Sequence, residues 1–214
     1  MLKVEKFIPL EFAANNYLVY DDELKCAVLI DCAGSDDEIF KFIETNNLNL
    51  EKILITHAHF DHVLGLKKFK EKFPSVKILL PREDKKLYDN LGVQCDMFGQ
   101  RRAETVQIDE LIDETSNIEL CGKKIEIIAT PGHSKGSCCY LVEGNLFSGD
   151  TLFYEEIGRC DLPTGSFKEI EHSIKEKLFK LNENIKVFAG HGDNTSIAHE
   201  KIHNAYFGTN ARYF

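Results

Sequence analysis

The sequence predicts an α/β protein in which stacked β-sheets carry helices on their outer faces. Nine short runs of β-branched, aromatic or alternating residues have the character of strands. Four longer stretches repeat apolar residues at helical spacing. The strand-like runs fall into two groups along the chain, each followed by helical sequence, and this order favours layers of sheet and helix.

The predicted strands span residues 2–8, 16–20, 26–31, 52–56, 76–80, 123–130, 137–142, 145–148 and 186–189. The predicted helices span residues 36–45, 63–73, 167–181 and 195–207. Ser166 is a suitable N-cap for the third helix. Residues 81–114 are polar and charge-rich with weak periodicity, so we expect a partly helical surface excursion from a single domain over residues 1–214.

Charge and cysteine content exclude several classes of protein. The chain has 26 Lys and Arg against 35 Asp and Glu, and its net charge of −9 disfavours nucleic-acid binding. The sequence contains no run of about 18 apolar residues, which is the length that a membrane-spanning helix needs. Seven cysteines without a CxxC pair indicate reduced thiols in place of a disulfide framework. We therefore expect a cytoplasmic protein, monomeric or homodimeric, that acts on a small molecule.

The strongest chemical signal is the sequence HAHFDH over residues 57–62, which follows a predicted strand. It holds the four donors His57, His59, Asp61 and His62 within six positions. Imidazole and carboxylate groups suit Zn, Fe or Mn. Side chains 57 and 59 point the same way in an extended stretch and can share one metal, and after the turn Asp61 and His62 can face a second.

Three further donors follow predicted strands, each beside a glycine. His133 follows Gly132, Asp150 follows Gly149, and His191 lies between two glycines. Loops at the ends of strands are where functional sites are commonly built. Together with the first motif they give seven nitrogen and oxygen donors in four loops.

These motifs resemble the metallo-β-lactamase superfamily of metal-dependent hydrolases over nearly the whole chain. The match consists of HxHxDH at 57–62, PGH at 131–133, SGD at 148–150 and GHG at 190–192, in the family's order. The segments TPGHSKGS (130–137), IGRCDLP (157–163) and GHGDNTS (190–196) are most similar to the single-domain glyoxalase II-like hydrolases.

The resemblance implies a four-layer αββα sandwich with a site for two divalent metal ions, zinc first and iron or manganese as alternatives. The first metal would be held by His57, His59 and His133, and the second by Asp61, His62 and His191. Asp150 would bridge them. The implied reaction is hydrolysis of a thioester such as a hydroxyacyl-glutathione by a metal-bridging hydroxide that the catalytic Asp61 orients.

Supporting residues follow from the same resemblance. Asp31 and Asp161 would support the site without binding metal. Glyoxalase II proper binds glutathione through a C-terminal helical domain, which we expect this chain to lack, so Lys135, Arg159 and Lys201 are the candidate substrate contacts. Cys160 is the one cysteine whose predicted loop could face the metals.

Other functions of the same family remain alternatives. An iron-dependent persulfide dioxygenase shares a Gly-Arg-x-Asp loop like that of residues 158–161, and a lactonase or other ester hydrolase would use the same donors. The acidic charge disfavours a nuclease. His59 argues against flavin-linked diiron relatives, which usually carry Glu there, and a non-catalytic descendant would be expected to have lost donors.

Overall fold

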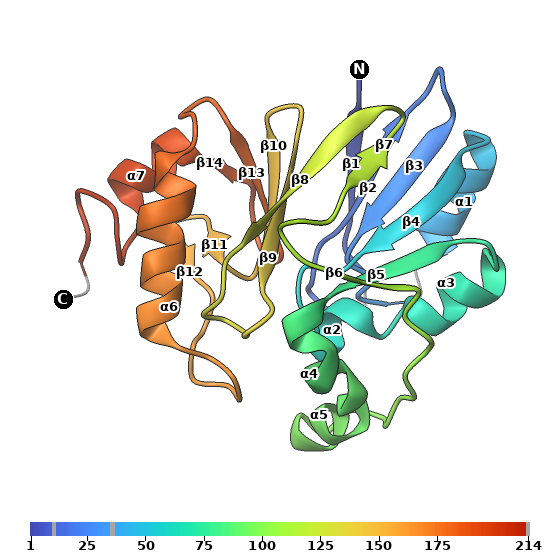
Figure 1. Ribbon diagram of the computed structural model, residues 1–214, viewed down its shortest axis with the longest axis horizontal. Coiled ribbons are helices and arrows are strands. Elements are labelled where there is room, and N and C mark those ends of the chain that lie inside the picture. The colour runs from blue at the N-terminus through green and yellow to red at the C-terminus, as the bar shows by residue number, and fades with distance from the viewer. Residues whose placement is uncertain (10–11, 35–36, 213–214) are drawn as a thin grey trace. The chain divides into compact units, whose positions relative to one another are not determined.

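Figure 1 shows the computed structural model of the chain, which describes residues 1–9, 12–34 and 37–212. The chain divides into two compact units. The first unit consists of Met1–Ile112 and Glu119–Lys123, and the second consists of Asp113–Ile118 and Lys124–Phe214. Each unit is built around one mixed sheet.

The first unit contains a six-stranded sheet in the order β1-β2-β3-β4-β5-β6. Its strands are β1 (Lys3–Phe7), β2 (Asn16–Asp21), β3 (Cys26–Ile30), β4 (Asn49–Leu54), β5 (Lys77–Pro81) and β6 (Glu110–Ile112). Its helices are α1 (Asp37–Thr45), α2 (Phe60–Val63), α3 (Leu66–Lys72), the 3-10 turn η1 (Arg82–Asp84), α4 (Lys85–Asp89) and α5 (Leu91–Met97). The strands from β3 to β6 run parallel, so their carboxyl ends lie at one edge.

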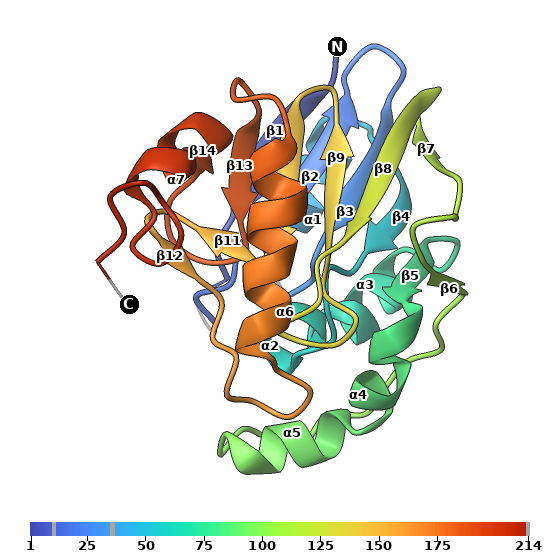
Figure 2. The ribbon, with the colours of Figure 1, turned by 60° about the vertical axis from the view of Figure 1, so that its left-hand side comes forward.

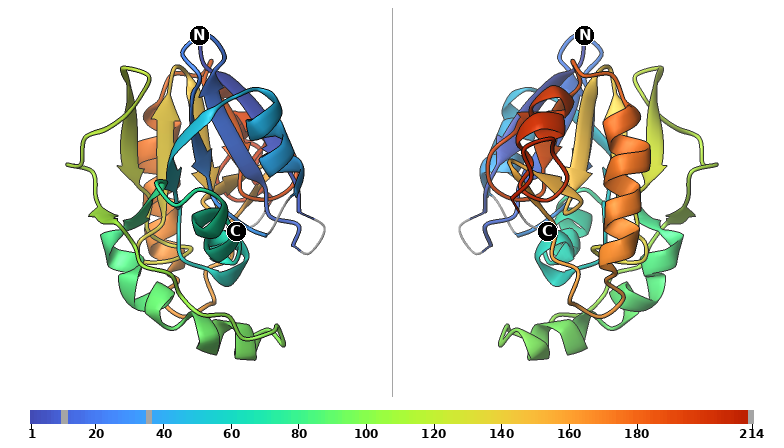
Figure 3. Two further views of the ribbon diagram at one scale, coloured as in Figure 1. Left: turned by 90° about the vertical axis from the view of Figure 1, so that its right-hand side faces the viewer. Right: turned by 90° about the vertical axis from the view of Figure 1, so that its left-hand side faces the viewer.

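Alternating apolar residues explain how helices cover the first sheet. Leu18, Leu29 and Ile53 come from neighbouring strands and are fully buried. They pack in one cluster with Ile39 of α1 and Phe69 of α3. Figures 1 and 3 show α1 and α3 on the same side of this sheet. The burial of this face fixes the register of the strands and thereby the loops at their ends.

A second six-stranded sheet has the order β14-β13-β10-β9-β8-β7 and belongs to the second unit, except for residues 119 and 120 of β7 and residue 123 of β8, which are assigned to the first unit. Its strands are β7 (Ile118–Leu120), β8 (Lys123–Ala129), β9 (Cys138–Val142), β10 (Asn145–Gly149), β13 (Lys186–Ala189) and β14 (Thr195–Ser196), and β11 (Leu152–Phe153) pairs with β12 (Glu156–Ile157). Helix α6 (Phe167–His172) continues through a π turn, η2 (Ser173–Lys177), and a 3-10 turn, η3 (Leu178–Lys180), before α7 (Ile197–His203). Figure 2 shows the α6 segment lying along the sheet, where Ile170, Ile174 and Leu178 join the core.

The main predicted elements are present with shifted ends. The helix predicted over 63–73 begins earlier, as α2 at Phe60, and is interrupted before α3. The helix predicted from Thr195 begins only at Ile197, because residues 195 and 196 pair with β13. The predicted start of the first helix at Asp36 lies outside the described residues. Strands β6, β7, β11, β12 and β14 were not predicted, since each has only two or three residues.

Residues 81–112 form short helices and strand β6 in the first unit, and residues 113 and 114 belong to the second unit. Tyr88, Leu91 and Cys95 are buried in the core of the first unit, which ties this charge-rich segment to the sheet. No helix in the described ranges has the length and apolar character to cross a membrane.

The expectation that every cysteine is a free thiol is corrected by the structure. Cys26 in β3 and Cys121, which follows β7, form a disulfide across 95 residues of sequence. Their Cα atoms lie 6.1 Å apart. The sequence could not reveal this pair because the fold alone brings the two positions together. The free cysteines are Cys32, Cys95, Cys138, Cys139 and Cys160.

Candidate metal centre

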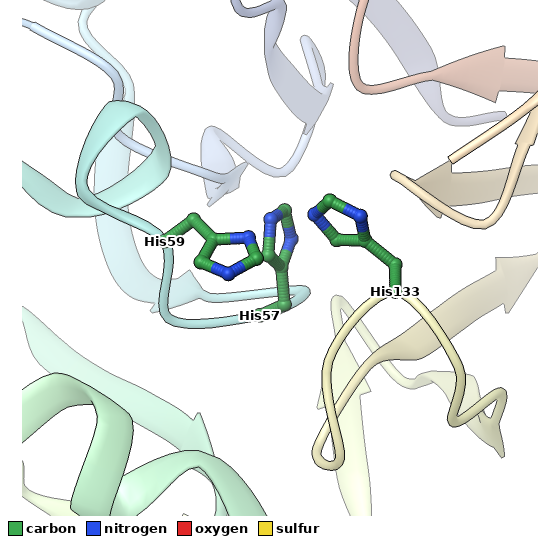
Figure 4. A group of neighbouring side chains, drawn as sticks. All are labelled: His57, His59 and His133. Atoms are coloured by element: carbon green, nitrogen blue, oxygen red, sulfur yellow. The ribbon is translucent and has the colours of Figure 1, made fainter. Parts of the chain in front are cut away.

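Four predicted donors lie in the first unit, on the loop from β4 into α2. His57, His59 and His62 are buried, and the Asp61 side chain is 23% exposed. The ring centroids of His57 and His59 are 4.9 Å apart, and those of His57 and His62 are 4.2 Å apart. Figure 4 shows the rings of His57 and His59 on this loop. The fold of this one loop is therefore enough to bring the motif's donor groups close together.

Asp31 organises these histidines from the end of β3. Its carboxylate accepts hydrogen bonds from the Thr56 backbone N–H at 2.7 Å and the Thr56 hydroxyl at 2.8 Å. The Nδ1 atom of His62 lies 2.9 Å from Asp31 Oδ2. Since an ionised carboxylate only accepts, Nδ1 of His62 carries the proton and Nε2 presents its lone pair.

His57 is fixed in the same tautomer through Thr56. The Thr56 Oγ1 atom lies 3.1 Å from His57 Nδ1. Because the single hydroxyl proton is donated to Asp31, Oγ1 accepts from His57 Nδ1–H. His57 therefore also presents Nε2 as a ligand atom. Such outer hydrogen bonds orient metal-binding imidazoles.

Two residues that the sequence did not single out hold the backbone of this loop. The buried Asp84 carboxylate accepts from Ala58 N–H at 2.9 Å. The buried Gln94 amide donates to Ala58 C=O at 3.0 Å and accepts from Phe60 N–H at 3.2 Å. Both come from residues 81–114, where a polar and charged composition gives no signal that separates a buried acceptor from a solvated one.

The other three predicted donors lie in the second unit. His133 lies in the loop between β8 and β9 (Figure 4). Its side chain is buried, with 3% exposed. Asp150 follows β10 and is 8% exposed, and His191 follows β13 with 30% of its side chain exposed. Asp150 Oδ2 is 3.4 Å from His133 Nε2 and 3.5 Å from His191 Nε2. Asp150 is thus the shared neighbour of both rings.

The tautomer of His133 makes this cluster suited to a cation. Its Nδ1 donates to the backbone carbonyl of Arg159 at 2.7 Å, so a neutral ring directs the Nε2 lone pair toward Asp150. A lone pair and a carboxylate oxygen at 3.4 Å repel each other unless a proton or metal ion compensates the charge. Imidazole and carboxylate are ligands typical of Zn, Fe and Mn, so the donor set fits divalent metals.

Two glycines make room for Asp150. A Cβ atom on Gly190 would lie 2.3 Å from Asp150 Oδ1, and one on Gly158 would lie 1.7 Å from the Asp150 backbone oxygen. Either added carbon would displace the carboxylate or the loop that carries it. Gly190, which precedes His191, and Gly158 therefore serve close packing around Asp150.

Apart from Asp31, which is buried in the first unit, the predicted supporting and substrate residues lie in the second unit. The guanidinium of Arg159 donates two hydrogen bonds of 2.7 Å to Asp161, and this pairing lowers the pKa of the Asp161 carboxyl to about 2. Lys201 on α7 donates to Glu183 at 2.6 Å. The exposed Lys135 donates its backbone N–H to Thr164. Burial raises the pKa of the Cys160 thiol to about 11, so that thiol is a poor nucleophile at neutral pH.

Comparison with known proteins gives the family. The model of the metallo-β-lactamase superfamily matches residues 10–191. The hydroxyacylglutathione hydrolase GloC of Haemophilus influenzae is 36% identical over 202 residues, covering 92% of this chain and 94% of that protein.

Solved structures agree with that match. The BLEG-1 B3 metallo-β-lactamase aligns with a TM-score of 0.84 and 32% identity, over 96% of this chain and 99% of that one. TTHA1623 in a di-iron-bound form aligns with a TM-score of 0.85 and 29% identity, over 95% and 100%. The predicted α/β class and the fold that the resemblance implied are confirmed.

Proposed function

Because the chain belongs to the metallo-β-lactamase superfamily of metallo-hydrolases, we propose that it hydrolyses the thioester bond of an acylated thiol such as a hydroxyacyl-glutathione. The similarity to hydroxyacylglutathione hydrolase GloC supports this substrate class. The proposal includes two divalent metal ions, with zinc as the expected metal.

One observation carries the proposal. His57, His62 and His133 each use Nδ1 for a hydrogen bond, so each has Nε2 available as a metal ligand. We propose that His57, His59 and His133 hold one metal and that Asp61, His62 and His191 hold the other, with Asp150 binding both. When bound, such a metal pair lowers the pKa of a water molecule and polarises a carbonyl group.

The chain's own residues complete the chemistry. The partly exposed Asp61 carboxylate orients the attacking water toward the thioester carbonyl carbon. Attack breaks the carbon–sulfur bond and yields a carboxylic acid and a thiol. Arg159, Lys135 and Lys201 are proposed substrate contacts, and the Asp161 carboxylate holds the Arg159 guanidinium in one orientation.

The test combines metal analysis with turnover of S-lactoylglutathione. We expect about two metal equivalents per chain and hydrolysis that chelation abolishes. His59→Ala and Asp150→Ala should lose both metal and turnover, whereas His203→Ala, which changes an exposed histidine on α7, should keep both. Full metal loading and turnover in either ligand variant would refute the ligand assignment.

Substrate alternatives are decided by parallel assays on the same protein. Oxygen uptake with glutathione persulfide, without thioester hydrolysis, would replace the proposal with a dioxygenase. Preferential turnover of a lactone would replace the proposal with hydrolysis of an ester. Preferential turnover of the β-lactam nitrocefin would replace it with hydrolysis of an amide. Metal analysis separates zinc from iron and manganese.

We also propose a cytoplasmic location, which the five free cysteines support because thiols persist in reducing compartments. In that case Cys26 and Cys121 should be thiols in growing cells and pair only after oxidation. The test is to quench the cells with acid, then alkylate the free thiols at neutral pH and identify the alkylated cysteines by mass spectrometry. Quantitative protection of both cysteines from alkylation would argue against a reducing compartment.

A further inference from the structure

The first unit contains a hollow of about 910 Å³ that plays no part in the proposed metal ligation. Its wall includes four cationic side chains, Lys67 and Lys68 of α3 with Arg101 and Arg102 of the segment after α5. We call it the cationic hollow. In Figure 1 this segment runs from α5 back past α3. The volume lies in the range of pockets that hold small molecules.

The charge of the cationic hollow contrasts with that of the chain. The whole protein carries a net charge of −9, yet the hollow is lined by four cations and one acid, Glu104. Lys67 lies 3.8 Å from Glu104, and Arg102 lies 3.5 Å from Asp96. In the described ranges Lys68 and Arg101 have no acidic partner.

The hollow borders the helix that carries metal donors. Phe12 and Leu64 line it, and the Phe12 ring packs edge-on against Phe60 at 5.7 Å. Phe60 separates His59 from Asp61 in the sequence, and Leu64 N–H donates to the Phe60 carbonyl at the end of α2. The hollow therefore lies next to α2, the short helix of the first unit that carries the proposed metal donors Asp61 and His62.

We propose that the cationic hollow binds the anionic carrier half of the thioester, with Lys68 and Arg101 pairing with its carboxylates or phosphates. This inference rests on the proposed function. An anion fits the hollow because Lys68 and Arg101 lack acidic partners among the described residues and would gain them when the anion binds. The protein is acidic overall, so it also needs local positive charge to attract a negatively charged substrate. Lys68 and Arg101 are then specificity-determining residues that take no part in bond cleavage.

The test compares wild type with Lys68→Gln/Arg101→Gln in the metal-loaded enzyme. We expect KM for an anionic thioester to rise roughly five- to tenfold with kcat unchanged, from the loss of two exposed ion pairs. KM for the neutral thioester S-acetyl-N-acetylcysteamine should not change. S-Lactoylglutathione and acetyl-coenzyme A form separate arms, and the larger rise in KM identifies a carboxylate or a phosphate carrier.

Controls separate charge from structure. Lys77→Gln/Lys124→Gln removes two exposed lysines at the starts of β5 and β8 and should leave KM unchanged. Lys68→Arg/Arg101→Lys keeps the charges and should restore most of the affinity. Raising the salt concentration should raise KM of wild type but not of the glutamine variant.

A direct measurement of carrier binding tests the cationic hollow separately from the proposed thioester hydrolysis. Calorimetry with S-hexylglutathione and with coenzyme A should give a Kd that the glutamine variant raises by a similar factor, whether or not any thioester is turned over. Loss of turnover by every thioester in wild type would refute the proposed function. Equal KM and Kd in wild type and the glutamine variant for both carriers would refute the cationic hollow as their binding site.

Discussion

At the scale of single residues, the Asp31 carboxylate binds two parts of the loop from β4 into α2 at once. It accepts from both donors of Thr56 and from Nδ1 of His62. Asp31 is 2% exposed and has a positive φ of 59°, a conformation that non-glycine residues adopt infrequently. The backbone there is held by the surrounding hydrogen bonds, which include Asp31 N–H to Leu54 C=O at 3.0 Å.

We predict that Asp31→Asn lowers metal content and kcat about 10- to 100-fold without unfolding the protein. The asparagine oxygen can still accept from Thr56 N–H, but its NH₂ group would face the Thr56 hydroxyl and His62 Nδ1, which favours the wrong tautomer. Metal analysis, kinetics and circular dichroism check this. Asp22→Asn, at an exposed carboxylate that pairs with Lys3, is the control. Normal metal content in Asp31→Asn would show that the tautomer is set elsewhere.

We predict that Cys160→Ser keeps kcat within about twofold of wild type. Burial, and next the neighbouring Asp161 charge, raise the pKa of the thiol to about 11, so it is protonated throughout the neutral range. Its Sγ donates weakly to the Gly158 carbonyl, and a serine hydroxyl can make the same contact. Steady-state kinetics from pH 6 to 9 checks this. A large loss of kcat with metal content unchanged would instead assign the thiol a chemical role.

The sequence predicts the candidate donors and the supporting carboxylate of Asp31, but it could not predict the acceptor that orients His133. His133 stands out beside a glycine, but its Nδ1 bonds the backbone carbonyl of Arg159, and a backbone atom leaves no mark on residue type. The sequence predicts a role for the Arg159 side chain as a substrate contact. The structure pairs that side chain with Asp161 and uses the main chain to hold His133.

At the scale of elements, residues 81–114 hold in place the loop that carries four of the proposed metal donors. Asp84 and Gln94 belong to short helices of this segment and bind the backbone of residues 58 and 60. Gln94 also donates to the Leu87 carbonyl at 2.9 Å, so one amide joins α4, α5 and the donor loop. A hydrophobic pattern cannot predict such a contact, because the contact is polar and buried.

We predict that Gln94→Met lowers the free energy of unfolding by about 1–3 kcal/mol and also lowers metal affinity. Methionine has a similar shape but cannot satisfy the Ala58 carbonyl or the Phe60 N–H. Urea unfolding and metal titration measure the two effects. The exposed Gln107→Met is the matched control. If Gln94→Met binds metal as tightly as wild type, the loop is held by Asp84 without help from Gln94.

The Cys26–Cys121 disulfide links β3 to the turn after β7, and we predict that reducing it destabilises the first unit. A cross-link over 95 residues restricts the unfolded chain and contributes up to about 4.7 kcal/mol in the chain-entropy model. Reductant should therefore lower the urea midpoint of oxidised wild type. It should have no effect on Cys26→Ser/Cys121→Ser, and an unchanged wild-type midpoint would exclude a stabilising cross-link.

The segment predicted as one helix over 167–181 shows what the spacing of apolar residues can predict and what it cannot. Its apolar residues lie on one side as predicted and join the core. Its hydrogen-bonding pattern nevertheless changes from α to π at Ser173, whose hydroxyl donates to the Pro131 carbonyl at 2.8 Å. The spacing of apolar residues fixes the buried face, but a local change of pitch depends on such tertiary contacts.

At the scale of the whole molecule, the seven donors are shared between two compact units. The first unit supplies four donors on one loop, and the second supplies three from loops far apart in sequence. The sequence predicts the donors because each motif is local and chemically distinctive. Grouping the three in the second unit requires the parallel pairing of β10 and β13, which places Asp150 and His191 at adjacent strand ends.

Since the proposed ligand set draws on both units, we predict that metal removal lowers the thermal stability of the whole chain. A ligand that binds only the native state stabilises it by about 4 kcal/mol when its concentration is a thousand times its Kd. Wild type with bound metals should unfold in one transition. Chelated wild type should unfold at lower temperature, with the transitions of the two units separated.

Calorimetry with and without chelator measures this, and Asp150→Ala should behave like chelated wild type in both conditions. Dialysis of the chelated protein against zinc should restore the single transition in wild type but not in the variant. Metals bound within one unit alone would stabilise that unit and leave the other transition unmoved. That result would contradict ligation shared between the units while leaving the ligands within the stabilised unit intact.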